Sequence, residues 1–203
     1  MSNVNNLRFT TLLKSSNGFS EVYMDTYFAS KRIIFLEGDI TNESACTFAK
    51  EMLNLELSNS KESIKLIINS PGGEIEAGMF ILDVIHGCSA PVEMFCLGKA
   101  SSMAAIIFVS GKNGRYILEN SKLMIHQPLV LNNTNKNLSE IKKIANDLEN
   151  RKNQLFEILK DHSNLSLEIL EEETKEDRYY SAQEAVQYNL ADKIITFGEI
   201  LSI

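Results

Sequence analysis

The stretch Ile64-Lys65-Leu66-Ile67-Ile68-Asn69-Ser70-Pro71-Gly72-Gly73 decides the fold, because it joins a strand pattern directly to a turn signal. Its first five residues are mostly apolar and predict a strand, and the proline with two glycines at its end predicts a tight turn. Beyond the turn, from Ala77 to Ile85, apolar residues return at helical spacing. The segment from residue 64 to 85 is therefore expected to form a strand, a turn and a helix in succession.

The same strand-turn-helix unit recurs on both sides of this stretch. Before it, a strand at residues 32–36 is followed by a helix at about 43–57, and after it a strand at 91–97 leads to a helix at 103–109. Further predicted elements are short strands at 115–118 and 122–125, a long amphipathic helix from Asn137, a short helix from Ser181 to about 189, and a strand at 193–197. These repeated units predict an α/β fold whose strand ends carry the chemistry.

Length, composition and charge favour one domain and exclude some partners. The chain has 203 residues, 44% of them hydrophobic, which is enough for one substantial core. Its net charge of -7 and the lack of a concentrated basic face argue against a nucleic-acid surface. Three cysteines without a Cys-x-x-Cys pair disfavour both a disulfide framework and a zinc site.

The distribution of apolar residues also bears on the location of the protein. No apolar segment reaches the roughly 20 residues of a membrane span, and Met1 to Asn6 are too polar for a secretory signal. We therefore expect a cytoplasmic protein with no membrane association. We also expect a flexible or processed amino terminus over residues 1–16 and a single domain over residues 17–203.

A serine pair lies where a strand is expected to turn into a helix. Ser101 and Ser102 follow Gly98-Lys99-Ala100 and precede Met103, so an apolar strand gives way through glycine to small residues. A step of this kind leaves a serine oxygen exposed beside the free N–H groups of a helix start, which suits a nucleophile.

A base and an acid are available elsewhere in the chain. His126 follows the predicted strand at 122–125 and is the histidine placed to act as a general base, because His86 and His162 sit at or near helix ends. Taken alone, His126 is better explained as an ordinary strand-end histidine. Asp177 closes a run of six acidic residues that begins at Glu168, and such a run is usually a solvated helix face.

Four segments of the chain resemble, in the same order, the signatures of the ClpP family of self-compartmentalised serine peptidases. They are Asn69-Ser70-Pro71-Gly72-Gly73, Gly98-Lys99-Ala100-Ser101-Ser102-Met103, Met124-Ile125-His126-Gln127-Pro128-Leu129 and Asp177-Arg178-Tyr179-Tyr180-Ser181-Ala182. Weaker similarity extends from about Tyr23 to Phe197. The resemblance implies the ClpP/crotonase-like spiral of ββα units with a protruding long helix.

The resemblance also selects the candidate catalytic residues. The Ser-Met pair of the family picks Ser102 rather than Ser101 as nucleophile, with His126 as general base. The motif that follows Asp177 picks this acid from the charge run as the carboxylate that orients the imidazole. Backbone N–H groups of Gly73 and Met103 suit an oxyanion hole, since Gly73 has no side chain and Met103 begins a helix.

For the whole assembly, the resemblance implies a serine endopeptidase that cleaves unfolded proteins and peptides inside a chamber. Two stacked heptameric rings of this chain would form the chamber, and a hexameric AAA+ unfoldase of the ClpX, ClpA or ClpC type would feed it. The unfoldase would use ATP, while this chain would need neither a metal nor an organic cofactor.

The chain departs from the family pattern after Leu129, and three alternatives to this interpretation stay open. Where the family usually has a glycine pair after Leu129, this chain has Val130-Leu131-Asn132-Asn133. The alternatives are a catalytically silent subunit of a mixed ring, a crotonase-fold acyl-CoA enzyme, and a Ser-Lys peptidase that would enlist Lys99. The crotonase chemistry usually relies on glutamates, and the Ser-Lys mechanism would leave His126 idle.

Overall fold

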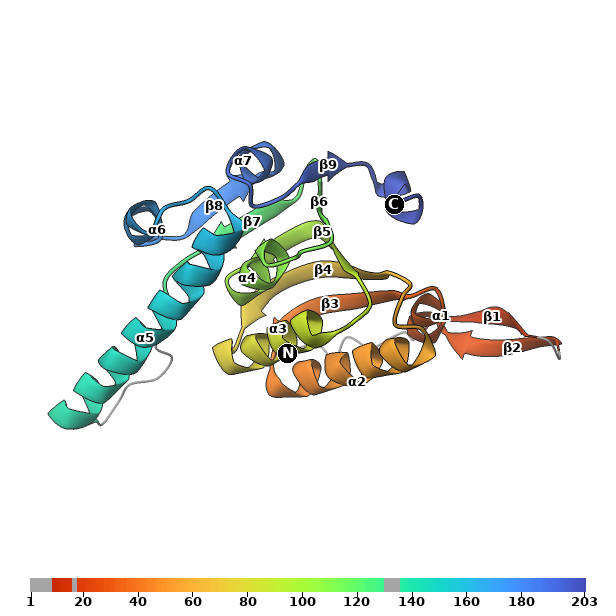
Figure 1. The fold of residues 1–203 in the computed structure, drawn as a ribbon. Coiled ribbons are helices and arrows are strands. Elements are labelled where there is room, and N and C mark those ends of the chain that lie inside the picture. The colour runs from red at the N-terminus through yellow and green to blue at the C-terminus, as the bar shows by residue number, and fades with distance from the viewer. Residues whose placement is uncertain (1–8, 16–17, 130–135) are drawn as a thin grey trace.

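The computed structural model describes residues 9–15, 18–129 and 136–203 (Figure 1). Residues 130–133, where the expected glycine pair is missing, and the polar start at 1–6 lie outside the described residues. Across the described part of the chain, none of the helices is both long enough and apolar enough to cross a membrane.

A seven-stranded sheet organises the part of the chain that the structure describes. Five strands lie side by side and parallel, and a sixth pairs in parallel with the C-terminal end of the third. The exception is the last pairing, which is antiparallel. The parallel series is β3 (Ile33–Ile40), β4 (Ile64–Gly73), β5 (Val92–Ser101), β6 (Arg115–Leu118) and β9 (Lys193–Ile195), and β7 (Lys122–Ile125) connects β5 to antiparallel β8 (Arg178–Ser181).

Helices cover the sheet on the side that holds the main core. Figure 1 shows α2 and α3 packed across the curved strands β3 and β4, with α4 beside them. All seven residues of α4 are buried, which makes this short helix the centre of the core. These helices are α2 (Asn42–Ser58), α3 (Ile75–Gly87) and α4 (Met103–Val109). The opposite face of the sheet carries a smaller apolar cluster around Ile67 and Phe95.

Helix α5 (Leu138–His162) extends away from the body (Figure 1). Its buried residues, Leu155, Phe156 and Leu159, all lie towards its C-terminal end, whereas Leu138 and Ile141 are exposed. A capping box between Asn137 and Glu140 starts the helix, as the sequence predicts. The same device, between Ser181 and Glu184, opens α7 (Ala182–Gln187).

Several elements were not expected from the sequence. A hairpin of β1 (Thr10–Ser15) and β2 (Gly18–Tyr23) precedes α1 (Met24–Ser30), so paired structure lies on both sides of the boundary predicted at residue 16. Exposed apolar residues such as Leu12 and Phe19 give the hairpin no buried face, and a pattern without burial carries little strand signal. The division into an amino-terminal segment and one domain stays a prediction.

Two further short elements precede and follow the segment of Asp177. They are α6 (Leu167–Glu173), which agrees with the helix expected in the acidic run, and β8, which the sequence did not predict. A 3-10 turn, η1 (Phe197–Leu201), closes the described chain. The mixed α/β architecture with its mostly parallel sheet confirms the predicted fold class, and it is consistent with the fold that the resemblance implies.

Candidate active site

Ser102 sits at the tip between β5 and α4 in a strained conformation. Its φ of 54° and ψ of -125° lie outside the regions that non-glycine residues favour, which costs on the order of 1–3 kcal/mol. A bond from the Ser102 N–H to the Met124 carbonyl, 2.7 Å long, holds the turn to β7. Ser101 is buried at 7% exposure while Ser102 is half-buried, so Ser102 is the serine of the pair that is open to the cavity.

The glycines at the end of β4 allow its backbone to approach the serine turn closely. A Cβ atom on Gly72, whose φ is +93°, would lie 2.5 Å from the Ser101 carbonyl oxygen and 3.0 Å from the Met103 amide nitrogen. Any side chain at this position would therefore collide with the Ser102 turn. Ser70, fully buried, stabilises the turn by accepting from the Gly72 N–H at 3.0 Å and donating to the Gly38 carbonyl at 2.6 Å.

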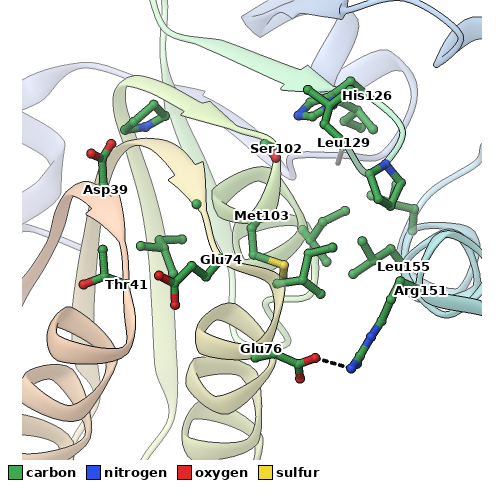
Figure 2. A pocket seen from close by; sticks show the side chains of 18 of the residues that line it. Asp39, Thr41, Glu74, Glu76, Ser102, Met103, His126, Leu129, Arg151 and Leu155 are labelled. Carbon is green, nitrogen blue, oxygen red and sulfur yellow. Dashed lines mark hydrogen bonds and ion pairs between the residues drawn. The ribbon is translucent and has the colours of Figure 1, made fainter. Parts of the chain in front are cut away.

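A cavity of about 800 Å³ opens beside this turn, and Figure 2 shows Ser102 and Met103 on its wall. Four of the five sequence-predicted site residues line it: Gly73, Ser102, Met103 and His126. Met103 begins α4, where backbone N–H groups have no partner within the helix, so its amide is of the kind that binds an oxyanion. The structure thus gathers the candidate nucleophile, base and oxyanion donors around one space.

His126 directly follows β7, and its ring is held by its own neighbour. The Nδ1 atom lies 2.6 Å from the carbonyl oxygen of Gln127. A carbonyl oxygen only accepts hydrogen bonds, so Nδ1 carries the proton in this contact. In the neutral ring the lone pair is then on the other nitrogen, Nε2, which is the tautomer that a general base facing the serine needs.

Asp177 is the predicted site residue that the structure leaves apart. It is exposed, precedes β8, and is not among the residues that line the cavity. The β7–β8 register ends at Ile125 opposite Arg178, and its continuation by one step would put His126 opposite Asp177. Across the described residues, however, no hydrogen bond joins the Asp177 carboxylate to the imidazole. The Nδ1–H group donates its hydrogen bond to the Gln127 carbonyl instead.

The residues on either side of Asp177 form hydrogen bonds with neighbouring elements, although the Asp177 side chain forms none with the other described residues. Arg178 donates to Glu173 at 3.1 Å and to Glu184 at 3.2 Å, and its guanidinium lies 4.6 Å from the centre of the Tyr180 ring. On the other side, the Gln127 N–H donates to the Thr174 carbonyl at 3.3 Å. This last bond and the pairing of Arg178 with Ile125 hold the segment of Asp177 beside the end of β7.

The remaining histidines take no part in this arrangement. The rings of His86 and His162 stack with their centres 6.4 Å apart, at the ends of α3 and α5. His86 Nε2 contacts the Ser110 carbonyl at 3.3 Å, and burial lowers the pKa of the His86 side chain. Neither residue lines the cavity.

Two of the three cysteines, Cys88 and Cys96, are unsuited to act as nucleophiles. Burial, together with a hydrogen bond to Glu56, raises the pKa of the Cys88 thiol to about 11, and burial raises that of Cys96 to about 12. Only a thiolate reacts readily, so these two thiols are inert near neutral pH. Within the described ranges, no group of three or more His, Cys, Asp or Glu side chains is arranged to hold a metal ion.

Sequence reasoning missed the charged residues around the cavity. Glu76, in the first turn of α3, forms an ion pair with Arg151 of α5, and both line the cavity (Figure 2). Asp39 and Glu74 line it as well, at the ends of β3 and β4. Glu76 and Arg151 are 75 positions apart, and no local pattern announces a pair at that separation. Only Glu74 could have been suspected from the sequence, because it directly follows Gly73, a predicted site residue.

A serine on a strained strand-to-helix turn, with a histidine on the same cavity of an α/β fold, is typical of serine hydrolases. The comparison with known families narrows this class. The model of the Clp protease family matches residues 17–197, and the chain therefore belongs to that family. Membership confirms the resemblance seen in the sequence and indicates a ClpP-type serine peptidase.

Proposed function

We propose that this chain is a serine endopeptidase that cleaves unfolded proteins and peptides with Ser102, His126 and Asp177 as its catalytic triad. The observation that carries the proposal is the strained Ser102 on a cavity shared with His126, in a chain of the Clp protease family. Strain at a non-glycine residue is characteristic of sites where a side chain must be held in one place for a reaction.

The proposed reaction begins when Ser102 Oγ attacks the carbonyl carbon of a peptide bond. His126 Nε2 takes the hydroxyl proton as the new bond forms and then gives it to the departing amine. The amides of Gly73 and Met103 stabilise the negative charge that develops on the carbonyl oxygen, each contributing on the order of 3 kcal/mol. Water then attacks the acyl-enzyme, with His126 again acting as base, and releases Ser102.

Asp177 has a distinct role in this scheme. The imidazole becomes positively charged during the attack, and a carboxylate near Nδ1 stabilises that charge better than a neutral carbonyl does. In the described conformation Nδ1 donates to the Gln127 carbonyl. The proposal therefore requires the His126 ring to exchange the Gln127 carbonyl for the Asp177 carboxylate, and the β7–β8 register that continues towards this pair supports the exchange.

For the assembly, we propose two stacked heptameric rings in the cytoplasm, fed by a hexameric AAA+ unfoldase that hydrolyses ATP. Family membership supports this proposal, since ClpP-type subunits usually form rings that work with Clp ATPases. The protruding α5 also carries two apolar side chains near its N-terminal end, Leu138 and Ile141, that the described part of the chain leaves exposed. A closed chamber would restrict cleavage to chains threaded into it.

The test combines covalent labelling with peptide turnover. A fluorophosphonate probe should label the wild-type protein at one serine, located by peptide mass mapping as Ser102, and a fluorogenic peptide should be cleaved. Ser102→Ala should abolish both signals, while Ser101→Ala, which changes the buried neighbour, should retain the label. Labelling elsewhere, or cleavage that survives Ser102→Ala, would refute the proposed nucleophile. Native mass spectrometry of the same protein measures the number of subunits.

A second candidate is a catalytically silent subunit of a mixed ring. The observation that favours it is the hydrogen bond from His126 Nδ1 to the Gln127 carbonyl, which leaves Asp177 unengaged. Assembled particles that neither bind the probe nor cleave peptides, alone or with a Clp ATPase, would support this alternative over the peptidase.

A further inference from the structure

One wall of the cavity is a single face of α5. Arg151, Leu155 and Leu159 are spaced four residues apart, so they lie above one another on the helix and span about 12 Å along its axis. Leu155 and Leu159 are buried, as is Phe156 beside them. Across from them lie Met103 and Ile106 of α4, which are also buried. This part of the cavity therefore offers an apolar surface to a substrate side chain.

The apolar part ends where α5 and α3 are joined by an ion pair. Arg151, one turn of α5 beyond Leu155, reaches across to Glu76 in the first turn of α3, as the dashed line in Figure 2 shows. The two side chains are 37% and 73% exposed, in contrast to the buried leucines. The pair thus crosses the cavity at its edge with solvent and connects two elements that both line it.

Such a pair limits what the apolar part can hold. A side chain that extends past Leu155 has to displace the guanidinium or the carboxylate. The displaced charge loses its partner, and an apolar substrate side chain offers no hydrogen bond or opposite charge in exchange. Side chains that end before the pair keep it intact.

We propose that the Glu76–Arg151 pair is a specificity determinant that bars large aromatic side chains from the apolar part of the cavity. Leu- or Met-sized side chains would be accepted next to the cleaved bond, and Trp-sized side chains would be rejected. This inference rests on the proposed peptidase function, and it concerns which polypeptides the site takes rather than whether Ser102 reacts.

The size of the effect follows from the exposure of the pair. Exposed ion pairs change equilibria by up to about fivefold, and salt weakens them. Removing either partner should therefore raise kcat/KM for a Trp peptide relative to a matched Leu peptide by about two- to fivefold. High salt should move the same ratio in the same direction in the unaltered protein.

The experiment compares two quenched fluorescent peptides that differ only in Leu or Trp at the cleaved position. The ratio of their kcat/KM values is measured for wild type, Glu76→Gln, Arg151→Met and the double charge exchange Glu76→Arg with Arg151→Glu. The single variants should shift the ratio towards Trp, and the exchange should restore it because the pair forms again. Lys160→Met removes a comparably exposed ion pair of α5, that with Glu157, outside the cavity, and should leave the ratio unchanged.

Three outcomes would overturn the inference. They are an unchanged ratio in both single variants, a fall in Trp cleavage on Arg151→Met, which would mean that the guanidinium stacks on aromatic rings, and a ratio that does not respond to salt. Binding of the same peptides to Ser102→Ala, followed by fluorescence anisotropy, gives the ratio without turnover. If wild type cleaves neither peptide, the proposed function fails, and the anisotropy ratio still decides the role of the pair.

Discussion

The two ends of the candidate catalytic relay differ in how the fold holds them. At one end, the Ser102 turn lies between a β4 glycine that admits no side chain and a helix with no exposed residue. At the other end, Asp177 is exposed in a short link between α6 and β8, and the His126 ring donates to the adjacent Gln127 carbonyl. The candidate nucleophile is preorganised by packing, whereas the candidate acid would reach His126 only after the rearrangement proposed above.

This difference predicts different effects for substitutions at the two ends. Buried groups are fixed by dense packing and change little without unfolding, while exposed links move at low cost. Changes at the Ser102 turn should therefore affect folding and activity together. Changes near Asp177 should affect activity with little loss of stability.

The largest expected effect is that of His126→Ala. Without a base, Ser102 keeps its proton, and kcat for peptide cleavage should fall by about 10⁴-fold or more. Labelling by fluorophosphonate should be lost as well, while thermal unfolding should change little. His86→Asn serves as the control, because His86 lies outside the cavity, and it should keep the label. Retention of more than a tenth of the activity in His126→Ala would exclude the proposed base.

A large effect on both properties is expected from Gly72→Ala. The new Cβ would lie 2.5 Å from the Ser101 carbonyl, and the backbone has a φ of +93°, so the free energy of unfolding should fall by about 3 kcal/mol. Urea unfolding measures the loss, and peptide cleavage should fall in parallel. Gly87→Ala is the matched control, since nothing lies within 4 Å of its added Cβ. Equal stability of the two variants would contradict the close packing at the turn.

Asp177→Ala should affect activity without affecting stability. Removal of the orienting acid alone is typically about 100-fold less damaging than removal of the base, so we expect kcat to fall by about 10²-fold. The neighbouring acid supplies the control, as Glu176→Ala should behave like wild type. An unaltered kcat in Asp177→Ala would show that the Gln127 carbonyl is a sufficient partner for His126, and would remove the contrast between the two ends.

The smallest expected effect concerns the attachment of β8. Hydrogen bonds from Ser181, backbone and hydroxyl, and then from Arg178 lower the pKa of Glu184 below its ordinary 4.5. A lowered pKa in the folded state means that Glu184 contributes stability above pH 4.5, which is lost as the pH falls below that value. Wild type should therefore lose more stability than Glu184→Gln between pH 7 and pH 3.

The Glu184 effect should stay below about 1 kcal/mol, because the residue is partly exposed. Thermal unfolding at pH 7, 4 and 3 measures it. Asp147→Asn, which alters an exposed carboxylate of α5, should reproduce the wild-type pH profile. Parallel profiles for wild type and Glu184→Gln would argue against a role of Glu184 in holding β8.

The strands and helices of the core were predictable because each is a short run of apolar residues with strand or helix spacing, bounded by turn or capping residues. The strand predicted at 64–68 and helix α4 are examples, and so are the capping boxes at Asn137 and Ser181. The tight turn predicted at 69–73 was wrong, because β4 continues through it to Gly73. The hairpin at Thr10–Tyr23 was not predictable, because its apolar side chains are largely exposed and give no burial pattern. Likewise, β8 has only four residues and follows an acidic run.

The candidate site divides in the same way. Ser102, Met103 and Gly73 follow from local strand-to-helix turns, and the structure brings them to one cavity with His126. The absence of a hydrogen bond between Asp177 and His126 in the described structure could not be inferred, because it depends on the His126 ring facing the Gln127 carbonyl. The Glu76–Arg151 pair joins two helices across the chain, and such a contact is decided by tertiary packing rather than by sequence neighbours.

The anchoring of α5 also gives this helix a mechanical character. Its 25 residues form a rod of about 37 Å that is gripped by the core only near one end. A displacement of the free N-terminal end would rotate the helix about its buried end, where Leu155 and Leu159 pack against the core. Arg151 lies one helical turn beyond these leucines, so a displacement of the free end would change the width of the cavity at the Glu76–Arg151 pair.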